Sequence, residues 1–424
     1  MQSHHLALCS KLLLTFQVVV TSAASVVDAQ DWPQFRGPNG NGHADATSVP
    51  TKWSEAENVT WKTPLPGRGW SSPVISGDLI WMTAAIESKA GPVDLIALCV
   101  DKESGKLRSR VQLFHVDEPG EIHALNSYAS PTPVISGESV FCHFGNFGTA
   151  CLDLKSGRIK WTTDRFKYET QNGPGASPVA WKNLLFFNCD GMDVQFAVAL
   201  DQATGETVWK VDRSGKLPEK EDFKKSYCTP AIVDTKNGPQ LISPASDWVY
   251  AYDPASGKEL WKVNYGQLGF STVPKPIFKD GTAFVLTSFM KSRLLAIDCE
   301  SAAMKSDSRV KWTNDTNMPQ KPSLLQVENH LYAIGDRGIL TCLNTETGEQ
   351  VFKDRIGGNF AASPLFAGGN VYLFDQKGKT TVFKHGNKLN VIAKNQLDGK
   401  FMASPAVSGN SLFLRTDKAI YRID

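Results

Sequence analysis

Short apolar runs, separated by tight turns that contain glycine, recur along most of the chain. The clearest example spans 132–161, with apolar runs at 133–135, 139–144 and 149–154 and a fourth run that ends in Trp161. Turns at 137–138, 145–148 and 155–157 separate these runs. Four short strands joined by such turns are typical of an antiparallel meander.

This unit occurs eight times, and each repeat opens with a proline that follows Ser, Thr or Lys. The pairs are Ser72-Pro73, Thr132-Pro133, Ser177-Pro178, Thr229-Pro230, Lys275-Pro276, Lys321-Pro322, Ser363-Pro364 and Ser404-Pro405. Successive prolines lie 60, 45, 52, 46, 46, 42 and 41 residues apart. Proline suits the first residue of a strand, where no ladder hydrogen bond is lost. A period of about 40–50 residues with several strands per unit predicts an all-β fold, an eight-bladed β-propeller with four-stranded antiparallel blades.

A second pattern, Asp-x-x-x-Gly-x-x-x-Trp, marks the last turn and the outer strand of several blades. It reads Asp153…Gly157…Trp161, Asp201…Gly205…Trp209 and Asp253…Gly257…Trp261, with the weaker forms Asn344…Gly348…Phe352 and Asp101…Gly105. The acidic side chain can bond to the turn's backbone, and glycine supplies a positive φ. We expect each Trp ring to cover the edge of a neighbouring blade.

The eighth repeat is incomplete, because after Ser404-Pro405 the chain has room for only three strands. An isolated strand-like segment, 58–64, precedes the first repeat. We therefore expect this N-terminal strand to close the ring as the outer strand of the last blade. The propeller domain is then predicted to span 58–424 as a single domain, despite a length that would otherwise suggest two or three domains.

The first 57 residues differ in kind from the repeats. Lys11 precedes an apolar run, 12–20, and small residues lead to Ala24 and Ala29. This predicts a secretory signal peptide over 1–29, with export to the periplasm or the extracellular space and no transmembrane segment after cleavage. Residues 30–57 are predicted to be a leader that packs on the ring through Trp32 and Phe35.

Composition narrows the choice of partners but does not name one. The net charge is +2 with 21% charged residues, so neither a nucleic-acid partner nor an electrostatic membrane contact is expected. We expect instead a protein or a small-molecule ligand, bound by loops at the funnel face of the ring.

The cysteines follow the repeat. Cys99, Cys151 and Cys342 stand two residues before the turn Asp or Asn, where other blades have alanine, so we interpret them as small core residues. Cys142 and Cys151 are equidistant from the centre of the turn 146–147. The sequence leaves open whether these two are bridged.

The Trp-containing turns inside proline-initiated blades resemble the tryptophan-docking repeats of the pyrroloquinoline-quinone (PQQ) propeller superfamily. That superfamily includes quinoprotein alcohol dehydrogenases and the non-enzymatic assembly lipoprotein BamB. The segments 31–42, Asp-Trp-Pro-Gln-Phe-Arg-Gly-Pro-Asn-Gly-Asn-Gly, and 65–73 are similar to the opening of PQQ-like propellers from planctomycete-type bacteria. For most of that group the resemblance implies a fold and no established reaction.

The resemblance also implies what a quinoprotein site would need. Those dehydrogenases hold PQQ over the channel with a calcium ion bound by carboxylate and amide oxygens, and many add a disulfide between adjacent cysteines. Here no two cysteines are adjacent, and the five residues before each of the eight pairs include no Asp or Glu. Carboxylates on this face would come from turns, at Asp190, Asp193, Asp247, Asp336 or Asp417, and nothing in their spacing shows that they converge.

We therefore expect a binding scaffold without catalysis, and assign no catalytic and no metal-binding residue. The alternative is a PQQ-dependent quinoprotein oxidoreductase with an atypical metal site, although PQQ and Ca²⁺ have no support here beyond the resemblance. His115, His123 and His143 are near one another in sequence, which leaves a metal site as a minor alternative.

The funnel rim is the candidate ligand site. Its predicted residues are Arg68, Trp70, Asn126, Tyr128, Asn172, Lys225, Tyr227 and Asn359. Basic and aromatic side chains suit a planar anion such as PQQ. The competing interpretation is that the aromatic rings only fill a wide channel.

Overall fold

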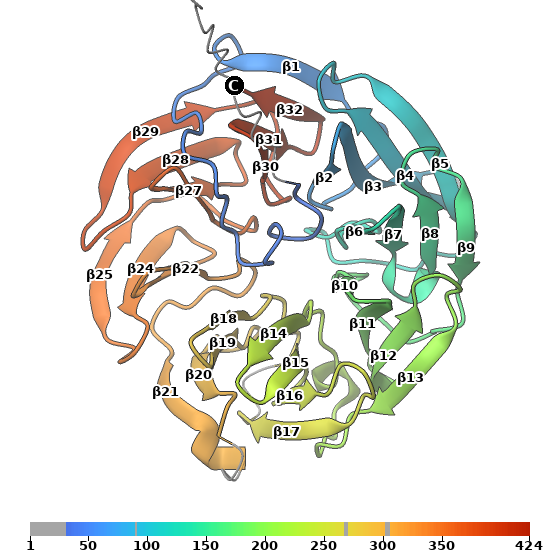
Figure 1. Ribbon diagram of the computed structural model, residues 1–424, viewed down its shortest axis with the longest axis vertical. Coiled ribbons are helices and arrows are strands. Elements are labelled where there is room, and N and C mark those ends of the chain that lie inside the picture. The colour runs from blue at the N-terminus through green and yellow to red at the C-terminus, as the bar shows by residue number, and fades with distance from the viewer. Residues whose placement is uncertain (1–30, 90, 267–269, 302–305) are drawn as a thin grey trace, which may run out of the picture.

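The chain forms a closed ring of eight four-stranded antiparallel sheets, as the sequence predicts (Figure 1). The computed structural model describes residues 31–89, 91–266, 270–301 and 306–424. The predicted signal peptide, 1–29, lies outside the described residues. Within the described part, no helix is long and apolar enough to cross a membrane.

The strands fall into four concentric sets. The innermost strands are β2 (Val74–Ser76), β6 (Val134–Ser136), β10 (Val179–Trp181), β14 (Ala231–Thr235), β18 (Ile277–Lys279), β22 (Leu325–Val327), β26 (Leu365–Ala367) and β30 (Ala406–Ser408). The second strands are β3 (Leu79–Glu87), β7 (Ser139–His143), β11 (Leu184–Asp190), β15 (Gly238–Pro244), β19 (Thr282–Leu286), β23 (His330–Ile334), β27 (Asn370–Phe374) and β31 (Ser411–Arg415). The third strands are β4 (Val93–Asp101), β8 (Thr149–Asp153), β12 (Gln195–Asp201), β16 (Trp248–Tyr252), β20 (Leu294–Asp298), β24 (Ile339–Asn344), β28 (Lys379–Lys384) and β32 (Ala419–Ile423). The outer strands are β5 (Leu107–Val116), β9 (Ile159–Thr163), β13 (Thr207–Asp212), β17 (Glu259–Asn264), β21 (Val310–Asn314), β25 (Gln350–Arg355), β29 (Asn390–Gln396) and β1 (Val59–Pro64).

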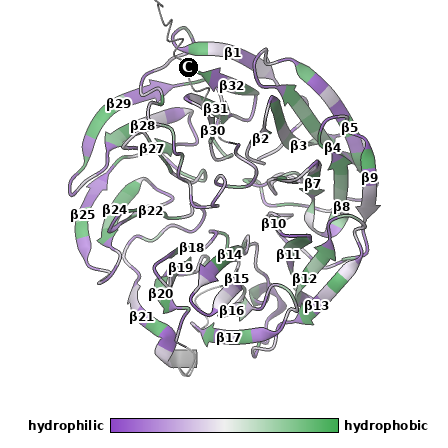
Figure 2. Cartoon of the chain, in the orientation of Figure 1, coloured by the Kyte–Doolittle hydropathy of each residue, from purple (hydrophilic) through white to green (hydrophobic). Residues whose placement is uncertain are grey.

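Hydropathy follows this layering (Figure 2). The second and third strands are almost wholly buried, whereas exposed and half-buried positions alternate along outer strands such as β1. The loops of the described part also contain short 3₁₀ helices, η1 (Gly145–Phe147), η2 (Glu221–Phe223) and η3 (Ser306–Arg309). The apolar core therefore lies between neighbouring blades, where the faces of adjacent sheets pack together.

Predicted contacts between a Trp ring and a turn glycine are present at several junctions between neighbouring blades. A Cβ added to Gly205 of blade three (β10–β13) would lie 2.7 Å from the ring of Trp161 in β9 of blade two (β6–β9). The Trp161 Nε1 donates to the Gln202 carbonyl at 2.9 Å. Because Gly205 has a φ of +74°, its turn both requires glycine and leaves room for the indole.

Blade one (β2–β5) makes the same contact with a different side chain. Its outer strand has Ser109 where other blades have Trp, but Trp81 of β3 reaches the turn of blade two instead. The Trp81 Nε1 donates to the Leu154 carbonyl at 3.2 Å, and a Cβ on Gly157 would lie 3.3 Å from its ring. A Trp ring thus packs on the glycine turn of blade two although the outer strand of blade one lacks the Trp of the Asp-x-x-x-Gly-x-x-x-Trp pattern.

The ring closes as predicted, because β1 pairs with β32 and completes the eighth blade (β30–β32 and β1). Trp61 of β1 lies over Gly105 of blade one, and its Nε1 donates to the Lys102 carbonyl at 3.1 Å. The closing junction therefore uses the same contact as the junctions inside the ring.

The cysteines of the described residues are buried free thiols, and Cys142 and Cys151 are not bridged. In the hairpin of β7 and β8, Cys142 pairs with Ala150, whereas Cys151 pairs with Phe141. The hairpin is centred on residue 146, whereas the sequence pattern predicts a centre between residues 146 and 147. That difference shifts the register by one residue, so the two thiols point to opposite faces of the sheet.

Candidate functional site

A ring of hydrogen bonds surrounds the central channel at the point where the innermost strands begin. In each bond the backbone N–H of one blade donates to the hydroxyl of the next, over distances of 2.9–3.0 Å. The donor and acceptor pairs are Ser72 to Thr132, Thr132 to Ser177, Ser177 to Thr229, Lys275 to Ser323, Ser323 to Ser363, Ser363 to Ser404, and Ser404 to Ser72.

This ring corrects one of the eight sequence pairs. In blade six (β22–β25) the equivalent residues are Ser323-Leu324, not Lys321-Pro322, because Ser323 accepts from one neighbour and donates to the other. The innermost strand β22 accordingly begins at Leu325. Lys321 instead forms an ion pair with Asp336 at 2.6 Å. In blade six the hydroxyl, and not the proline, therefore marks the equivalent position.

The ring has one gap, at Lys275. Seven of the eight equivalent positions are Ser or Thr, and a lysine has no hydroxyl oxygen to accept from the backbone of Thr229. The buried Lys275 side chain turns toward the leader, where a Cβ on Gly40 would lie 2.2 Å from its Nζ.

The leader crosses the central opening below this ring, as the blue segment in Figure 1 shows. Trp32 is 1% exposed and forms a two-bond bridge with Ile75 in β2. Farther along the leader, Gly42 accepts from the Phe366 backbone in β26, which is two blades away from β2 around the ring. Phe35 is the leader residue that lines the cavity above it. The leader therefore closes one end of the channel, and the anchoring role predicted for Trp32 agrees with its burial.

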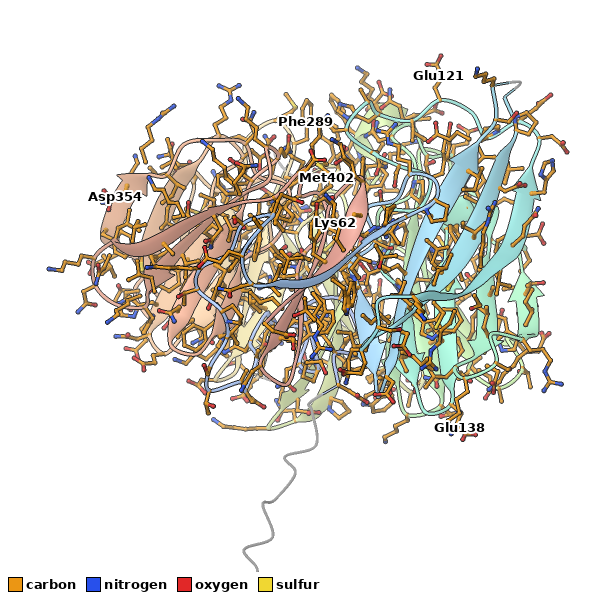
Figure 3. The ribbon with its side chains drawn as sticks, turned by 90° about the horizontal axis from the view of Figure 1, so that it is seen from above. Lys62, Glu121, Glu138, Phe289, Asp354 and Met402 are labelled. Atoms are coloured by element: carbon orange, nitrogen blue, oxygen red, sulfur yellow. The ribbon has the colours of Figure 1, made fainter. Side chains whose placement is uncertain are left out.

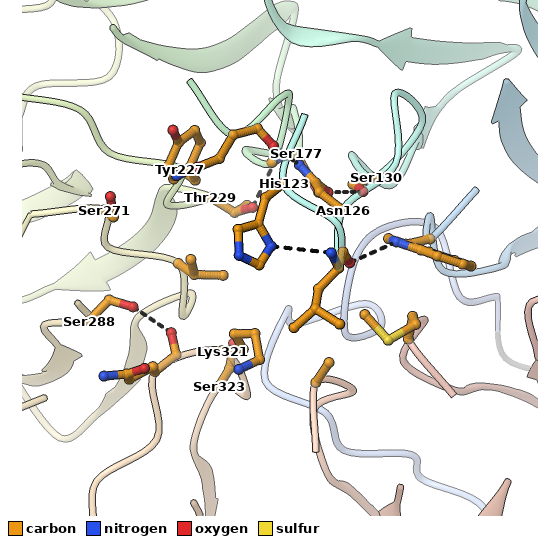
Figure 4. A pocket seen from close by; sticks show the side chains of 18 of the residues that line it. His123, Asn126, Ser130, Ser177, Tyr227, Thr229, Ser271, Ser288, Lys321 and Ser323 are labelled. Atoms are coloured by element: carbon orange, nitrogen blue, oxygen red, sulfur yellow. Dashed lines mark hydrogen bonds between the residues drawn. The ribbon is translucent and has the colours of Figure 1, made fainter. Parts of the chain in front are cut away.

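Above the ring the channel widens into a cavity of about 520 Å³ (Figure 4). We call this cavity the funnel. Its lining includes the seven ring hydroxyls together with Phe35, Trp70, His123, Leu125, Asn126, Ser130, Gln171, Asn172, Gly175, Lys225, Tyr227, Phe270, Ser271, Val273, Ser288, Phe289, Gln320, Lys321, Ala361 and Met402. Phe289 lies near one face of the disc in Figure 3 and Glu138 at the opposite face, so the funnel opens on the Phe289 side.

The polar groups of the funnel are mainly hydrogen-bond donors. The Lys225 amine donates to the Gln171 side-chain oxygen, and burial lowers the pKa of Lys225 while Asp222 opposes that shift. His123 accepts from the Leu125 backbone at Nδ1, so a neutral His123 carries its proton on Nε2. The ring hydroxyls already accept backbone N–H groups, and their hydrogens remain for another acceptor.

Five of the eight predicted rim residues line the funnel and three do not. Trp70, Asn126, Asn172, Lys225 and Tyr227 contribute to its wall.

Arg68 instead donates to the Ala124 carbonyl at 3.0 Å and lies 5.1 Å from the Trp70 ring. Tyr128 donates to the Gly120 carbonyl, and Asn359 is exposed on blade seven (β26–β29). The rim loops are long enough to turn these three side chains away from the cavity. Whether any of the eight binds a ligand stays a prediction.

The five turn carboxylates do not gather over the channel. Asp190 forms a buried bidentate pair with Arg213, with both N–O distances 2.8 Å, and burial raises the pKa of Asp190 while Arg213 opposes that shift. Asp336 accepts from the Lys321 amine, and Asp417 accepts from the Lys400 backbone.

The other two carboxylates, Asp193 and Asp247, differ in their surroundings. Asp193 accepts from the Glu169 backbone at 2.8 Å. Asp247 is 6% exposed, and burial raises its pKa to about 6. Four of the five carboxylates thus have separate partners, Asp247 Oδ1 has none within the described residues, and the five do not converge on one point.

The funnel lining does not fit a calcium-held PQQ. Calcium takes six to eight oxygen ligands, usually with several carboxylates, and none of the described lining residues is Asp or Glu. The side-chain oxygens of Asn126 and Gln171 already accept from Ser130 and Lys225. No group of three or more His, Cys, Asp or Glu residues suited to a metal occurs among the described residues.

The three histidines considered as metal ligands have different surroundings. His115 pairs with Asp94 at 2.6 Å in an exposed position, whereas His143 is buried and stacks on Phe187. Only His123 of the three lines the funnel.

The hydroxyl ring, His123 and Lys321 were not in the predicted site. The signal for the ring was present in the sequence, because a Ser or Thr precedes most of the blade-opening prolines. His123 and Lys321 had no comparable signal, since their place depends on how long rim loops fold. Phe289 is 54% exposed and comes from the loop after β19, which no repeat pattern marks.

Comparisons with known proteins agree with this architecture. A family model described as outer membrane protein assembly factor BamB matches residues 301–391. A tetrathionate hydrolase from Acidithiobacillus ferrooxidans is 23% identical over 291 residues, which cover 65% of this chain and 52% of that protein. The match thus spans about half the length of this curated relative.

Two solved structures show the likeness in fold. BamB from Moraxella catarrhalis has a TM-score of 0.58 at 13% identity, covering 86% of this chain and 100% of BamB. A quinohemoprotein alcohol dehydrogenase from Comamonas testosteroni has a TM-score of 0.64 at 10% identity, covering 92% and 80%. The resemblance to planctomycete-type proteins stays a prediction. The chain therefore has a β-propeller fold that is structurally similar to BamB and to the quinohemoprotein alcohol dehydrogenase, and its residues 301–391 match the BamB family model.

Proposed function

We propose that this propeller is a binding protein that takes a small anionic ligand into the funnel. The observation that carries this proposal is the composition of the lining, which includes Lys225, Lys321 and His123 but no carboxylate among its described residues. Lys225 donates to Gln171 and Lys321 to Asp336, but each ammonium has three N–H donors, so both keep donors for an anion rather than for a metal ion or a cationic ligand. Trp70, Tyr227 and neighbouring rings would cover its less polar surface.

The ligand class can be narrowed by chemistry. The name of the distant relative, tetrathionate hydrolase, identifies a small sulfur oxyanion as its substrate. Tetrathionate carries two negative charges and only acceptor oxygens at its ends, so a funnel rich in donors suits it. PQQ, an anionic planar molecule, is the second ligand to test, because similar folds include a quinohemoprotein dehydrogenase.

The funnel does not contain a recognisable catalytic pair. Nucleophilic catalysis by a hydroxyl needs a base within hydrogen-bond reach. Among the described residues, no imidazole or carboxylate is hydrogen-bonded to a ring hydroxyl, and the His123 Nδ1 faces the Leu125 backbone. We therefore assign binding and no reaction step to this site.

We also propose that the protein is exported. The apolar run at 12–20 and the small residues up to Ala29 support secretion to the periplasm or beyond. The intact mass of the mature protein tests this, and a mass that includes Met1 would contradict it.

Co-purification with envelope proteins would instead support a protein partner at the funnel face.

Titration calorimetry with tetrathionate and with PQQ tests the ligand proposal. We expect Lys225→Met to weaken binding about 10–100-fold, the usual value of a hydrogen bond to a charged group. Lys236→Met is the matched control, because Lys236 is exposed and pairs with Glu300 away from the funnel. Absence of binding of both anions, or equal affinity in the two variants, would contradict the proposal.

A further inference from the structure

The leader contains a buried cation whose hydrogen-bonding groups are mostly unused. Arg36 is 2% exposed, and its Nη2 donates to the Asn41 carbonyl at 2.7 Å. Its Nε and Nη1 have no hydrogen-bond partner within the described residues. Burial lowers the pKa of Arg36 to about 9, which leaves the guanidinium charged at neutral pH.

A second buried cation lies next to it. Lys275, at the gap in the hydroxyl ring, is 6% exposed, and its amine forms no ion pair in the described part of the chain. Burial, and then the charge of Arg36, lower the pKa of Lys275 to about 7. The two cations are therefore close enough to repel one another.

Among the residues that the structure describes, no carboxylate acts on the pKa of either cation. Burial is the sole influence on the pKa of Arg36, and Asp45 acts on His43 instead. A buried charge without a partner costs several kcal/mol, and an arginine does not lose its proton at neutral pH. The arrangement is thus incomplete without a negative group.

The backbone of the leader fits closely around both cations. A Cβ on Gly40 would lie 2.2 Å from the Lys275 Nζ, and a Cβ on Gly42 would lie 2.6 Å from the Arg36 Nη2. Both glycines have positive φ values, +63° and +83°. Side chains at these two positions would collide with the cations, so glycine is what lets the leader backbone lie this close to both of them.

We propose that Arg36 and Lys275 bind a small inorganic anion of the size of chloride, which fixes the leader across the channel. This site lies below the hydroxyl ring and shares no residue with the funnel. A test of this anion site is therefore independent of any test of the proposed function of the funnel.

Thermal unfolding of the full mature chain tests the proposal. Chloride or bromide is varied at constant ionic strength, with gluconate as the larger reference anion. Above saturation, each tenfold rise in chloride should raise Tm by about 1–2 °C for a chain of this size. Arg36→Met should abolish this dependence. Identical curves in chloride and gluconate would overturn the proposal.

Arg415 offers a matched control. It is also buried, but its Nη1 already donates to the carbonyls of Ser71 and Thr83 and to the Ser71 hydroxyl. Arg415→Met should lower Tm and keep the chloride dependence. Loss of the dependence in this variant as well would show that the effect is not specific to Arg36.

Crystals of the unmodified protein grown in sodium bromide provide a measurement that needs no variant. The proposal predicts an anomalous difference peak between the Arg36 guanidinium and the Lys275 amine. A map with bromide peaks elsewhere and none at this position would overturn it.

Discussion

Replacing Trp61 by alanine should open the contact that closes the ring. The Trp61 Nε1 donates to the Lys102 carbonyl at 3.1 Å, and its indole packs on Gly105 and lies 6.0 Å from the Phe413 ring. A hydrogen bond of this kind contributes about 1 kcal/mol. Because Trp61 is half-buried, about half of the 3–5 kcal/mol typical of buried Trp→Ala substitutions applies. We expect a total loss of about 2.5–3.5 kcal/mol in the free energy of unfolding.

Gly105→Ala tests the same contact from the other side. A left-handed residue other than glycine costs about 1–2 kcal/mol, and Gly105 has a φ of +70°. The new methyl group would also lie 2.6 Å from the Trp61 ring, so it must displace the indole. In the double variant the indole is absent, so the Gly105→Ala substitution then costs only the strain of its left-handed backbone.

A double-mutant cycle measured by urea unfolding separates the cost of backbone strain from the cost of the clash with the Trp61 ring. We expect the two losses to be non-additive by at least about 1 kcal/mol. Trp161→Ala, at the junction of blades two and three, is the control for an equivalent contact inside the ring. Additive losses, or a Trp61→Ala variant as stable as the unmodified protein, would refute this account of ring closure.

Three further predictions concern buried polar groups. Asp190→Asn should cost about 3–5 kcal/mol, because Arg213 would stay buried without its partner; denaturant unfolding measures the loss. At low concentrations of small anions, stability should rise with pH between about 7 and 10.5, because the Lys275 amine releases its proton in the folded state at lower pH than in the unfolded state. Melting curves across this range should lose that slope in Lys275→Met, and a retained slope would assign it to other groups. Ser363→Ala should cost about 1–2 kcal/mol by leaving the Ser323 N–H unpaired, and a neutral effect would show that the hydroxyl ring is not a structural support.

Repeats made the architecture predictable from the sequence. Proline at the start of the innermost strands and Trp over a glycine turn are local patterns, and together they indicated both the number of blades and the closing strand. In blade six the proline pattern is inexact, and the predicted ring position lies two residues before the observed one. The proline of blade six is displaced, so Lys321 was aligned with residues that are equivalent to Ser323.

The site was predicted less well, because it depends on contacts between distant segments. The composition of the rim indicated a funnel without carboxylates, and the described lining has none. The orientation of Arg68 and Tyr128 could not be inferred, since it depends on carbonyl groups of the 117–130 connection. The hairpin register that separates Cys142 from Cys151 depends on a single residue in the turn.

The central claim is that the funnel holds an anion by its own donors, without a metal ion. Titration calorimetry of the most tightly bound anion, first with EDTA and then with added calcium, tests this most directly. The account predicts the same Kd in both conditions and weaker binding in Lys225→Met. Binding that appears only when calcium is added would contradict it.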